Sequence, residues 1–238
     1  MKLQHLTLKL LVDAVYRCSL TGEKVNLYIA APPDTGKTYA TKTAREWPGV
    51  AYFWGKYSLT EYVLYLQNEA KNAKLFIHDD IGRVSPRYFQ DYVAVWAMMG
   101  DGEVVVKNYG KTMVAFSPYS VILTSTIDQY HQWTQLFRAT GLLNRFLPVK
   151  VGISDESAKE YLRGIQIKAW EDTGPSSDGQ YPKLDPTPLI RRDAMDLAKL
   201  GIGPRHAQSL LSLSRYLPEE ALEELVMVLR APSPVYEI

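Results

Sequence analysis

A short segment near residue 30 constrains the fold of this chain more than any other feature. A strand-like run over residues 25–30 leads into Pro-Pro-Asp-Thr-Gly-Lys-Thr at residues 32–38, and helix-forming residues follow directly. The last three residues of this loop, Gly36, Lys37 and Thr38, match the end of the phosphate-loop pattern G-x-x-x-x-G-K-S/T. A strand, a tight loop and a helix in this order predict an α/β fold, with a central parallel sheet flanked by helices.

The residue types of the loop suit a polyphosphate, which needs several hydrogen-bond donors converging on one concavity. Gly36 allows close approach of the backbone, Lys37 can reach the β- and γ-phosphates, and the Thr38 hydroxyl can coordinate Mg²⁺. Ala31 replaces the first glycine of the pattern and makes the loop slightly stiffer. The alternative interpretation is a surface turn before a helix. The residues expected to bind ATP are Pro33, Asp34, Thr35, Gly36, Lys37, Thr38 and Tyr39.

Two adjacent carboxylates form the second motif. They end the apolar segment Ala-Lys-Leu-Phe-Ile-His-Asp-Asp at residues 73–80, which predicts a buried strand. A parallel strand can deliver Asp79 beside Thr38 to hold Mg²⁺, and Asp80 can then orient and deprotonate the attacking water. The alternative is that both residues only cap the next turn. A strand and a helix between the two motifs are typical of repeated βα units and favour the catalytic interpretation.

Hydrophobic periodicity and turn residues predict the remaining elements. Helices are expected over residues 4–19, 58–71 (opened by a Ser-x-x-Glu capping box), 85–99 and 155–171; a hairpin over 103–115; and strands over 50–54 and 119–126. Four segments of the chain follow: residues 1–24, a helix packed on the core; 25–172, the nucleotide-binding core; 173–188, a linker; and 189–238, a small helical lid with a tail.

Composition excludes few functions. The chain has 238 residues, 46% of them hydrophobic, and a formal net charge of +1, so nucleic-acid binding has to be argued from local patches. A single cysteine, Cys18, excludes an intrachain disulfide framework and fits a reducing, cytoplasmic compartment. We expect no signal peptide, because Lys9 and Asp13 interrupt the first apolar run, and no membrane span.

Taken together, these motifs resemble those of AAA+ ATPases, from about residue 24 to residue 230. Residues 32–38 and 77–80 are similar to motifs of the superfamily 3 helicases of small DNA viruses, which often carry two aspartates in the second motif. The segment 103–128 is similar to the hairpin and sensor strand shared by those helicases, the minichromosome-maintenance helicases and the MoxR-type ATPases. Leu-Leu-Asn-Arg-Phe at 142–146 resembles an arginine-finger segment, and residues 203–211 resemble the sensor 2 helix of a lid.

The resemblance implies specific roles for three further positions. Thr126, with Ser125 as a rival, falls where these families usually carry the sensor 1 asparagine, and Arg145 would be a finger acting on a neighbour's nucleotide. Arg205 would contact the γ-phosphate from the lid. For each arginine the alternative is a structural cation. The chain departs from the families at Asp80, where a glutamate is usual, and in its lid, which plain superfamily 3 helicases lack.

The resemblance also implies a partner and an assembly. We expect a ring, a hexamer in particular, or a short filament that binds ATP and Mg²⁺ between its subunits. The assembly would work on DNA as a replication helicase, an initiator or a helicase loader, encoded by a virus or plasmid in a prokaryotic host. Replication proteins would be further partners. Lys107 and Lys111 flank the hairpin turn and are the candidate DNA contacts, although lysines also blunt strand edges. The alternatives are a MoxR-like protein remodeller and a nucleotide-switched assembly factor with little hydrolysis.

Overall fold

A parallel sheet forms the centre of the fold in the computed structural model, which describes residues 7–33, 35–55, 57–108, 111–116, 119–152, 202–230 and 236–237. The strands lie in the order β2-β3-β6-β1-β7-β8, and every neighbouring pair is parallel. They are β1 (Asn26–Ala30), β2 (Val50–Phe53), β3 (Leu75–His78), β6 (Ser120–Ser125), β7 (Leu147–Gly152) and the two-residue β8 (Tyr236–Glu237). The predicted α/β class with a central parallel sheet is thus confirmed.

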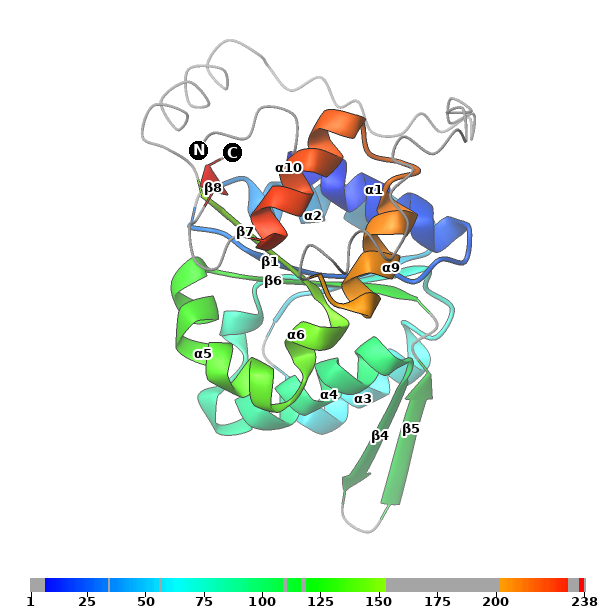
Figure 1. Ribbon diagram of the computed structural model, residues 1–238. Coiled ribbons are helices and arrows are strands. Elements are labelled where there is room, and N and C mark those ends of the chain that lie inside the picture. Colours follow the sequence, from blue (N-terminus) through cyan, green and yellow to red (C-terminus); the bar gives the residue numbers. More distant parts are fainter. Residues whose placement is uncertain are drawn as a thin grey trace, which may run out of the picture.

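Helices cover both faces of this sheet, because successive strand side chains point to opposite sides. On β1, Leu27 and Ile29 belong to one apolar cluster, and Tyr28 and Ala30 to the other. The first cluster includes helices α1 (Leu8–Leu20), α2 (Lys37–Thr43), α9 (Pro204–Leu213) and α10 (Glu219–Arg230). The second includes α3 (Leu59–Asn68), α4 (Phe89–Asp101), α5 (Ile127–Ala139) and α6 (Leu142–Arg145) (Figure 1). The sheet is therefore buried on both sides, as its continuous apolar strands require.

Local sequence signals set the helix ends. Ser58 and Glu61 form the predicted capping box at the start of α3, since the Ser58 hydroxyl accepts from the Glu61 N–H and the Glu61 carboxylate accepts from the Ser58 N–H. Three short 3₁₀ helices lie between longer elements: η1 (Ala44–Glu46), η2 (Ile81–Arg83) and η3 (Pro86–Tyr88). α4 ends at Gly102, which adopts the left-handed conformation that glycine favours.

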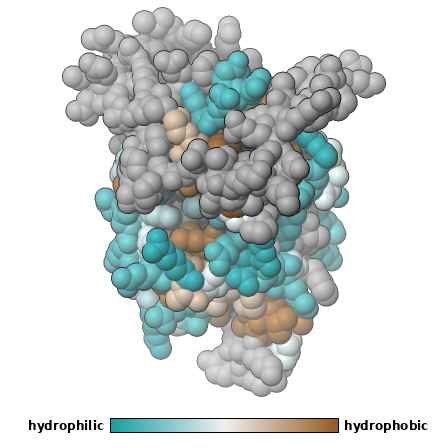
Figure 2. Space-filling view, viewed as in Figure 1, coloured by the Kyte–Doolittle hydropathy of each residue, from teal (hydrophilic) through white to brown (hydrophobic). Residues whose placement is uncertain are grey.

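The predicted hairpin is present as a separate two-stranded sheet. β4 (Glu103–Asn108) and β5 (Lys111–Phe116) are antiparallel, and the ribbon projects from the body of the molecule (Figure 1). At its base Val104 and Ala115 are buried in the second apolar cluster. In the space-filling view one of the brown, hydrophobic areas of an otherwise mainly hydrophilic described surface lies over this ribbon (Figure 2).

The carboxyl-terminal helices α9 and α10 pack on the same face of the sheet as α1. Leu213 and Leu225 are fully buried in the first apolar cluster, together with Leu11 of α1. The segment between Leu213 and Glu219, which contains Pro218, separates the two helices. The helices expected over 155–171 and just after residue 189, and the expected linker, lie outside the described residues. Within the described part of the chain, no helix combines the length and apolar character needed to cross a membrane.

Candidate functional site

The candidate site lies at the carboxyl ends of the central strands. β1 and β6 are paired neighbours, with Ala30 opposite Ser125. The helix that follows β1, α2, lies on one face of the sheet, whereas α5, which follows β6, lies on the other. In α/β sheets a crevice forms at the carboxyl edge where neighbouring connections leave toward opposite faces, and ligands bind in such crevices.

The phosphate-like loop occupies this edge directly after β1. Gly36 has a φ of 76°, a left-handed conformation that favours glycine, and it immediately precedes α2. The Thr35 hydroxyl donates to the Pro32 carbonyl oxygen over 2.9 Å and closes the turn. Lys37, the first residue of α2, is only 8% exposed. The loop is therefore tightly folded, with its lysine held inside.

Three of the other predicted loop residues are exposed, namely Pro33, Thr38 and Tyr39. Asp34 lies outside the described residues. The backbone carbonyl oxygen of Thr38 accepts from the Thr41 hydroxyl at 3.1 Å, which fixes the first turn of α2.

Asp79, the first carboxylate after β3, is fully buried and hydrogen-bonded through both oxygens. Its Oδ1 accepts from the Thr124 hydroxyl at 2.7 Å, and its Oδ2 accepts from the Tyr52 hydroxyl at 2.8 Å. Burial, together with the nearby Asp79, raises the pKa of Tyr52, so this phenol remains a donor. Such bonds are required because an unpartnered buried carboxylate is costly.

Asp80 has an unusual backbone. Among the described residues other than glycine it is the one with a positive φ, at 54°. Its N–H donates to the Thr124 hydroxyl oxygen at 2.8 Å, and its Oδ2 accepts from Arg83 Nε at 2.7 Å. A left-handed non-glycine residue stores roughly 1–3 kcal/mol of strain, and such residues cluster at functional sites. The conformation turns the chain sharply between β3 and η2.

Thr124 is the residue that joins the two aspartates, and the sequence did not identify it. It lies on β6, the strand between β1 and β3, and its single hydroxyl donates to Asp79 and accepts from Asp80. Strand alternation gives only part of the signal, because it places Thr124 on the face of Ile122 and Asp79 on the face of Ile77. The register that pairs Ile77 with Ile122 then aligns Thr124 with Asp79.

The two predicted sensor residues make other contacts. The Thr126 hydroxyl caps α5 by accepting from the Gln129 N–H at 3.2 Å, and Gln129 completes a capping box. The Ser125 hydroxyl donates to the Thr126 carbonyl oxygen and lies 2.6 Å from the Tyr28 hydroxyl oxygen. Both residues lie at the carboxyl edge, but the aspartates are joined through their neighbour Thr124.

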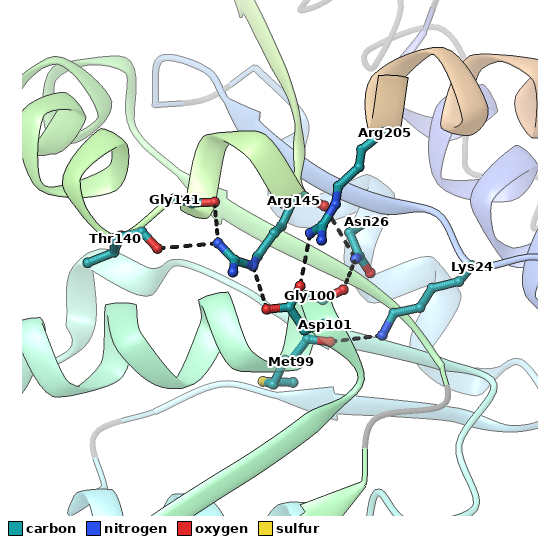
Figure 3. Close-up of polar contacts among 9 residues, drawn as sticks. All are labelled: Lys24, Asn26, Met99, Gly100, Asp101, Thr140, Gly141, Arg145 and Arg205. Carbon is teal, nitrogen blue, oxygen red and sulfur yellow. Dashed lines mark hydrogen bonds and ion pairs between the residues drawn. The ribbon is translucent and has the colours of Figure 1, made fainter. Parts of the chain in front are cut away.

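The two predicted arginines meet at one carboxylate (Figure 3). Arg145 Nε lies 2.7 Å from Asp101 Oδ2, and Arg205 Nη1 lies 2.9 Å from Asp101 Oδ1. Arg145 Nη1 also donates to the Gly141 carbonyl oxygen at 3.0 Å. Burial alone would raise the pKa of Asp101, but hydrogen bonds from both arginines hold it below its usual value.

This arginine cluster lies at the amino edge of the sheet, not beside the loop. Asn26, the first residue of β1, donates through Nδ2 to the carbonyl oxygens of Gly100 and Arg145, each at 3.3 Å. Lys24 Nζ donates to the Met99 carbonyl oxygen at 2.9 Å, and burial lowers the pKa of Lys24 to about 8 although Asp101 opposes the shift. The structure therefore does not bring Arg145 and Arg205 together with Lys37.

The candidate DNA contacts lie at the far end of the hairpin. Lys107 pairs with Thr112, and Asn108 pairs with Lys111, so both lysines belong to the last two pairs before the turn.

Comparisons with known proteins add no assignment: no protein-family model matches the sequence, and a search of curated proteins found no match. A functional interpretation therefore depends on the geometry of the site and on the motifs.

Proposed function

We propose that the chain is a P-loop ATP hydrolase of the AAA+ type that works on DNA. One observation carries the proposal. The loop ending in Lys37 and Thr38 follows β1, the aspartate pair follows β3, and Thr124 on the strand between them holds both aspartates. Phosphate-binding donors and carboxylates thus share the carboxyl edge of one sheet, where phosphoryl-transfer chemistry needs them.

The donor set fits ATP with magnesium. Mg²⁺ takes oxygen ligands and is usually held by one or two carboxylates together with substrate phosphates, and Thr38 and Asp79 supply oxygen ligands of this kind. The described residues contain no cluster of three side chains that could hold a metal. A metal held largely by phosphates does not require such a cluster. When bound, the metal would neutralise charge on the β- and γ-phosphates. Asp80 would then accept the proton of the attacking water.

The position of Arg145 supports assembly into a ring or filament. β1 runs from Asn26 at the arginine cluster to Ala30 at the loop, a distance of about 13 Å at ~3.3 Å per residue. An arginine at the amino edge is therefore remote from its own loop but can meet the loop of a neighbouring copy. An arginine finger supplied in this way stabilises charge in the transition state. Arg205 also pairs with Asp101, so it is similarly remote from the loop of its own chain.

The hairpin supports DNA as the substrate. Lys107 and Lys111 lie at the end of a ribbon that projects away from the body of the molecule (Figure 1). Lysines in such a position can contact phosphates without regard to sequence.

A second candidate function has its own supporting observation. Asp80 is paired with Arg83, and both oxygens of Asp79 already accept hydrogen bonds. Carboxylates held in this way suit a nucleotide-switched assembly factor that binds ATP and hydrolyses little of it.

ATP turnover, measured with and without single- and double-stranded DNA, tests these proposals. DNA-stimulated turnover is the expected result. Turnover at the same rate with and without DNA would favour the MoxR-like protein-remodelling alternative. ATP binding with negligible turnover under all conditions would favour the assembly factor, and absence of ATP binding would overturn the ATPase proposal.

A further inference from the structure

An exposed tryptophan contacts the arginine that pairs with the candidate catalytic carboxylate, and an exposed tyrosine follows three residues later in the chain. Trp54 and Tyr57 follow β2, the strand next to β3, and each is 49% exposed. Phe53 pairs with His78 across the two strands, so the chain leaves β2 at Trp54 alongside Asp79. Large aromatic side chains usually bury most of their surface, so two exposed rings within four residues of the chain are candidates for an interaction site.

Two described residues after β2, Gly55 and Tyr57, have specific conformations and contacts. Gly55 has a φ of 149°, and a Cβ atom at this position would lie 3.0 Å from the Tyr57 ring, so the turn requires glycine. The Tyr57 ring packs on Phe53 with centroids 4.9 Å apart, and the Tyr57 carbonyl oxygen accepts from the Tyr92 hydroxyl at 2.9 Å. The Tyr57 ring is therefore held in place before any partner arrives.

Arg83 connects this surface to Asp80. Its guanidinium carbon lies 4.5 Å from the centre of the Trp54 ring, while its Nε lies 2.7 Å from Asp80 Oδ2. The arginine side chain is about half exposed, so a partner can reach it. One cation thus contacts both an exposed aromatic face and the carboxylate assigned to the attacking water.

We infer that Trp54, Tyr57 and Arg83 form a binding surface for single-stranded nucleic acid, and that its occupation releases Asp80 from Arg83. The inference rests on the proposed function for the role of Asp80. Bases stack on aromatic rings whatever their sequence, and a guanidinium pairs with backbone phosphates. A phosphate that takes Arg83 would free the Asp80 carboxylate to act on water, so DNA binding would stimulate hydrolysis.

The base of the bound ATP does not fit this surface. β2 is three strands from β1, about 14 Å at ~4.8 Å per strand, and β3 with Asp80 lies between. In the proposed site Asp80 faces the γ-phosphate, so the base of that nucleotide points away from Trp54.

Binding of labelled oligothymidylate to the full-length chain, followed by fluorescence anisotropy without ATP, tests the surface. Trp54→Ala should weaken binding about tenfold or more, because one stacked base is lost, whereas Trp54→Phe should retain most of the affinity. Leu64→Ala is the matched control, since Leu64 on α3 is 42% exposed but lies outside the surface. Arg83→Gln should reduce the slope of affinity against salt by about one unit.

The coupling has a separate readout. In Arg83→Gln, Asp80 is already released, so turnover without DNA should rise and further stimulation by the oligonucleotide should fall. Wild-type affinity and salt slope in both Trp54→Ala and Arg83→Gln would overturn the inference, as would a wild-type chain that binds no oligonucleotide. Because oligonucleotide binding is measured without ATP, the binding results do not depend on whether the ATPase proposal holds, whereas the turnover results require ATPase activity and test only the coupling.

Discussion

The two edges of the central sheet carry charged groups in opposite ways. At the carboxyl edge Asp79 is fully buried, and two neutral hydroxyl groups from Tyr52 and Thr124 hold it. At the amino edge Asp101 is 40% exposed in its side chain and pairs with two cations, Arg145 and Arg205. The first carboxylate lies in a rigid, desolvated setting, and the second forms ion pairs that water and salt screen.

This difference suits two different tasks. A site buried between paired strands is preorganised for a small ligand, because its hydrogen-bonding groups are already fixed. Half-exposed ion pairs contribute little stability and are easily exchanged for other anions. In the proposed assembly, Arg145 and Arg205 would exchange Asp101 for the phosphates of a neighbouring subunit, whereas Asp79 would keep its partners. The predictions below test this comparison.

Lys37→Ala and Asp80→Asn should give the largest effects, both at the carboxyl edge. Lys37→Ala should abolish ATP binding, because it removes the phosphate-binding cation. Asp80→Asn should keep ATP binding and lose about 10²–10⁴-fold in hydrolysis, the usual contribution of a general base. Nucleotide-binding and single-turnover assays on both variants measure this. Normal turnover in Asp80→Asn would remove that residue from the catalytic role.

Arg145→Ala tests the amino edge and should lower hydrolysis about 10³-fold while ATP still binds, since arginine fingers contribute about that much or more. Mixing this variant with Lys37→Ala subunits should restore some activity, at interfaces that combine an intact loop with an intact arginine. Arg138→Ala tests the alternative, because Arg138 at the end of α5 is the second candidate for the arginine finger. If the two variants assemble together and no activity returns, Arg145 does not act on a neighbour.

Thr124→Val should reduce both stability and turnover, because Asp79 Oδ1 and the Asp80 N–H would each lose a partner. We expect a loss of about 1–3 kcal/mol in the free energy of unfolding. Thr124→Ser keeps the hydroxyl and should remain close to wild type. Thr126→Val removes a helix cap and should cost about 1 kcal/mol. Equal turnover in Thr124→Val and the wild type would show that the bridge between the aspartates is not needed for activity.

Some features of the fold and of the site follow from local sequence patterns, whereas others depend on contacts between distant parts of the chain. The loop, the capping box at Ser58 and the apolar strands follow local patterns, and the structure confirms the strands, the capping box and the parallel sheet. Thr124, Ser125 and Thr126 are consecutive hydroxyl residues, and only the register of β6 against β3 distinguishes them. Asp101 pairs with Arg145, which lies 44 positions further along the chain, and with Arg205, which lies 104 positions further along. No local sequence pattern encodes such pairings.

Lys107→Ala combined with Lys111→Ala should have a moderate effect confined to DNA affinity. Loss of phosphate contacts should weaken binding uniformly across sequences and flatten its salt dependence by up to about two units per engaged subunit. Titrations of several DNA sequences at different salt concentrations measure both quantities. Unchanged affinity and salt slope would favour protein as the substrate of the hairpin.

Asp101→Asn should give the smallest effect on stability, below about 1 kcal/mol at neutral pH, because its ion pairs are exposed. The pKa of Asp101 is lowered in the folded chain, so its charged form adds stability above the pKa of the unfolded carboxyl, near 4. That contribution is lost as pH falls through the folded-state pKa. Denaturant unfolding of the wild type and of Asp101→Asn at pH 7 and at about pH 3 measures this. The two should show a small gap in the free energy of unfolding, which narrows in acid and also narrows in ~1 M salt. A gap of several kcal/mol that persists in salt would mean that the amino edge is held as rigidly as the carboxyl edge, and the contrast between the two edges would fail.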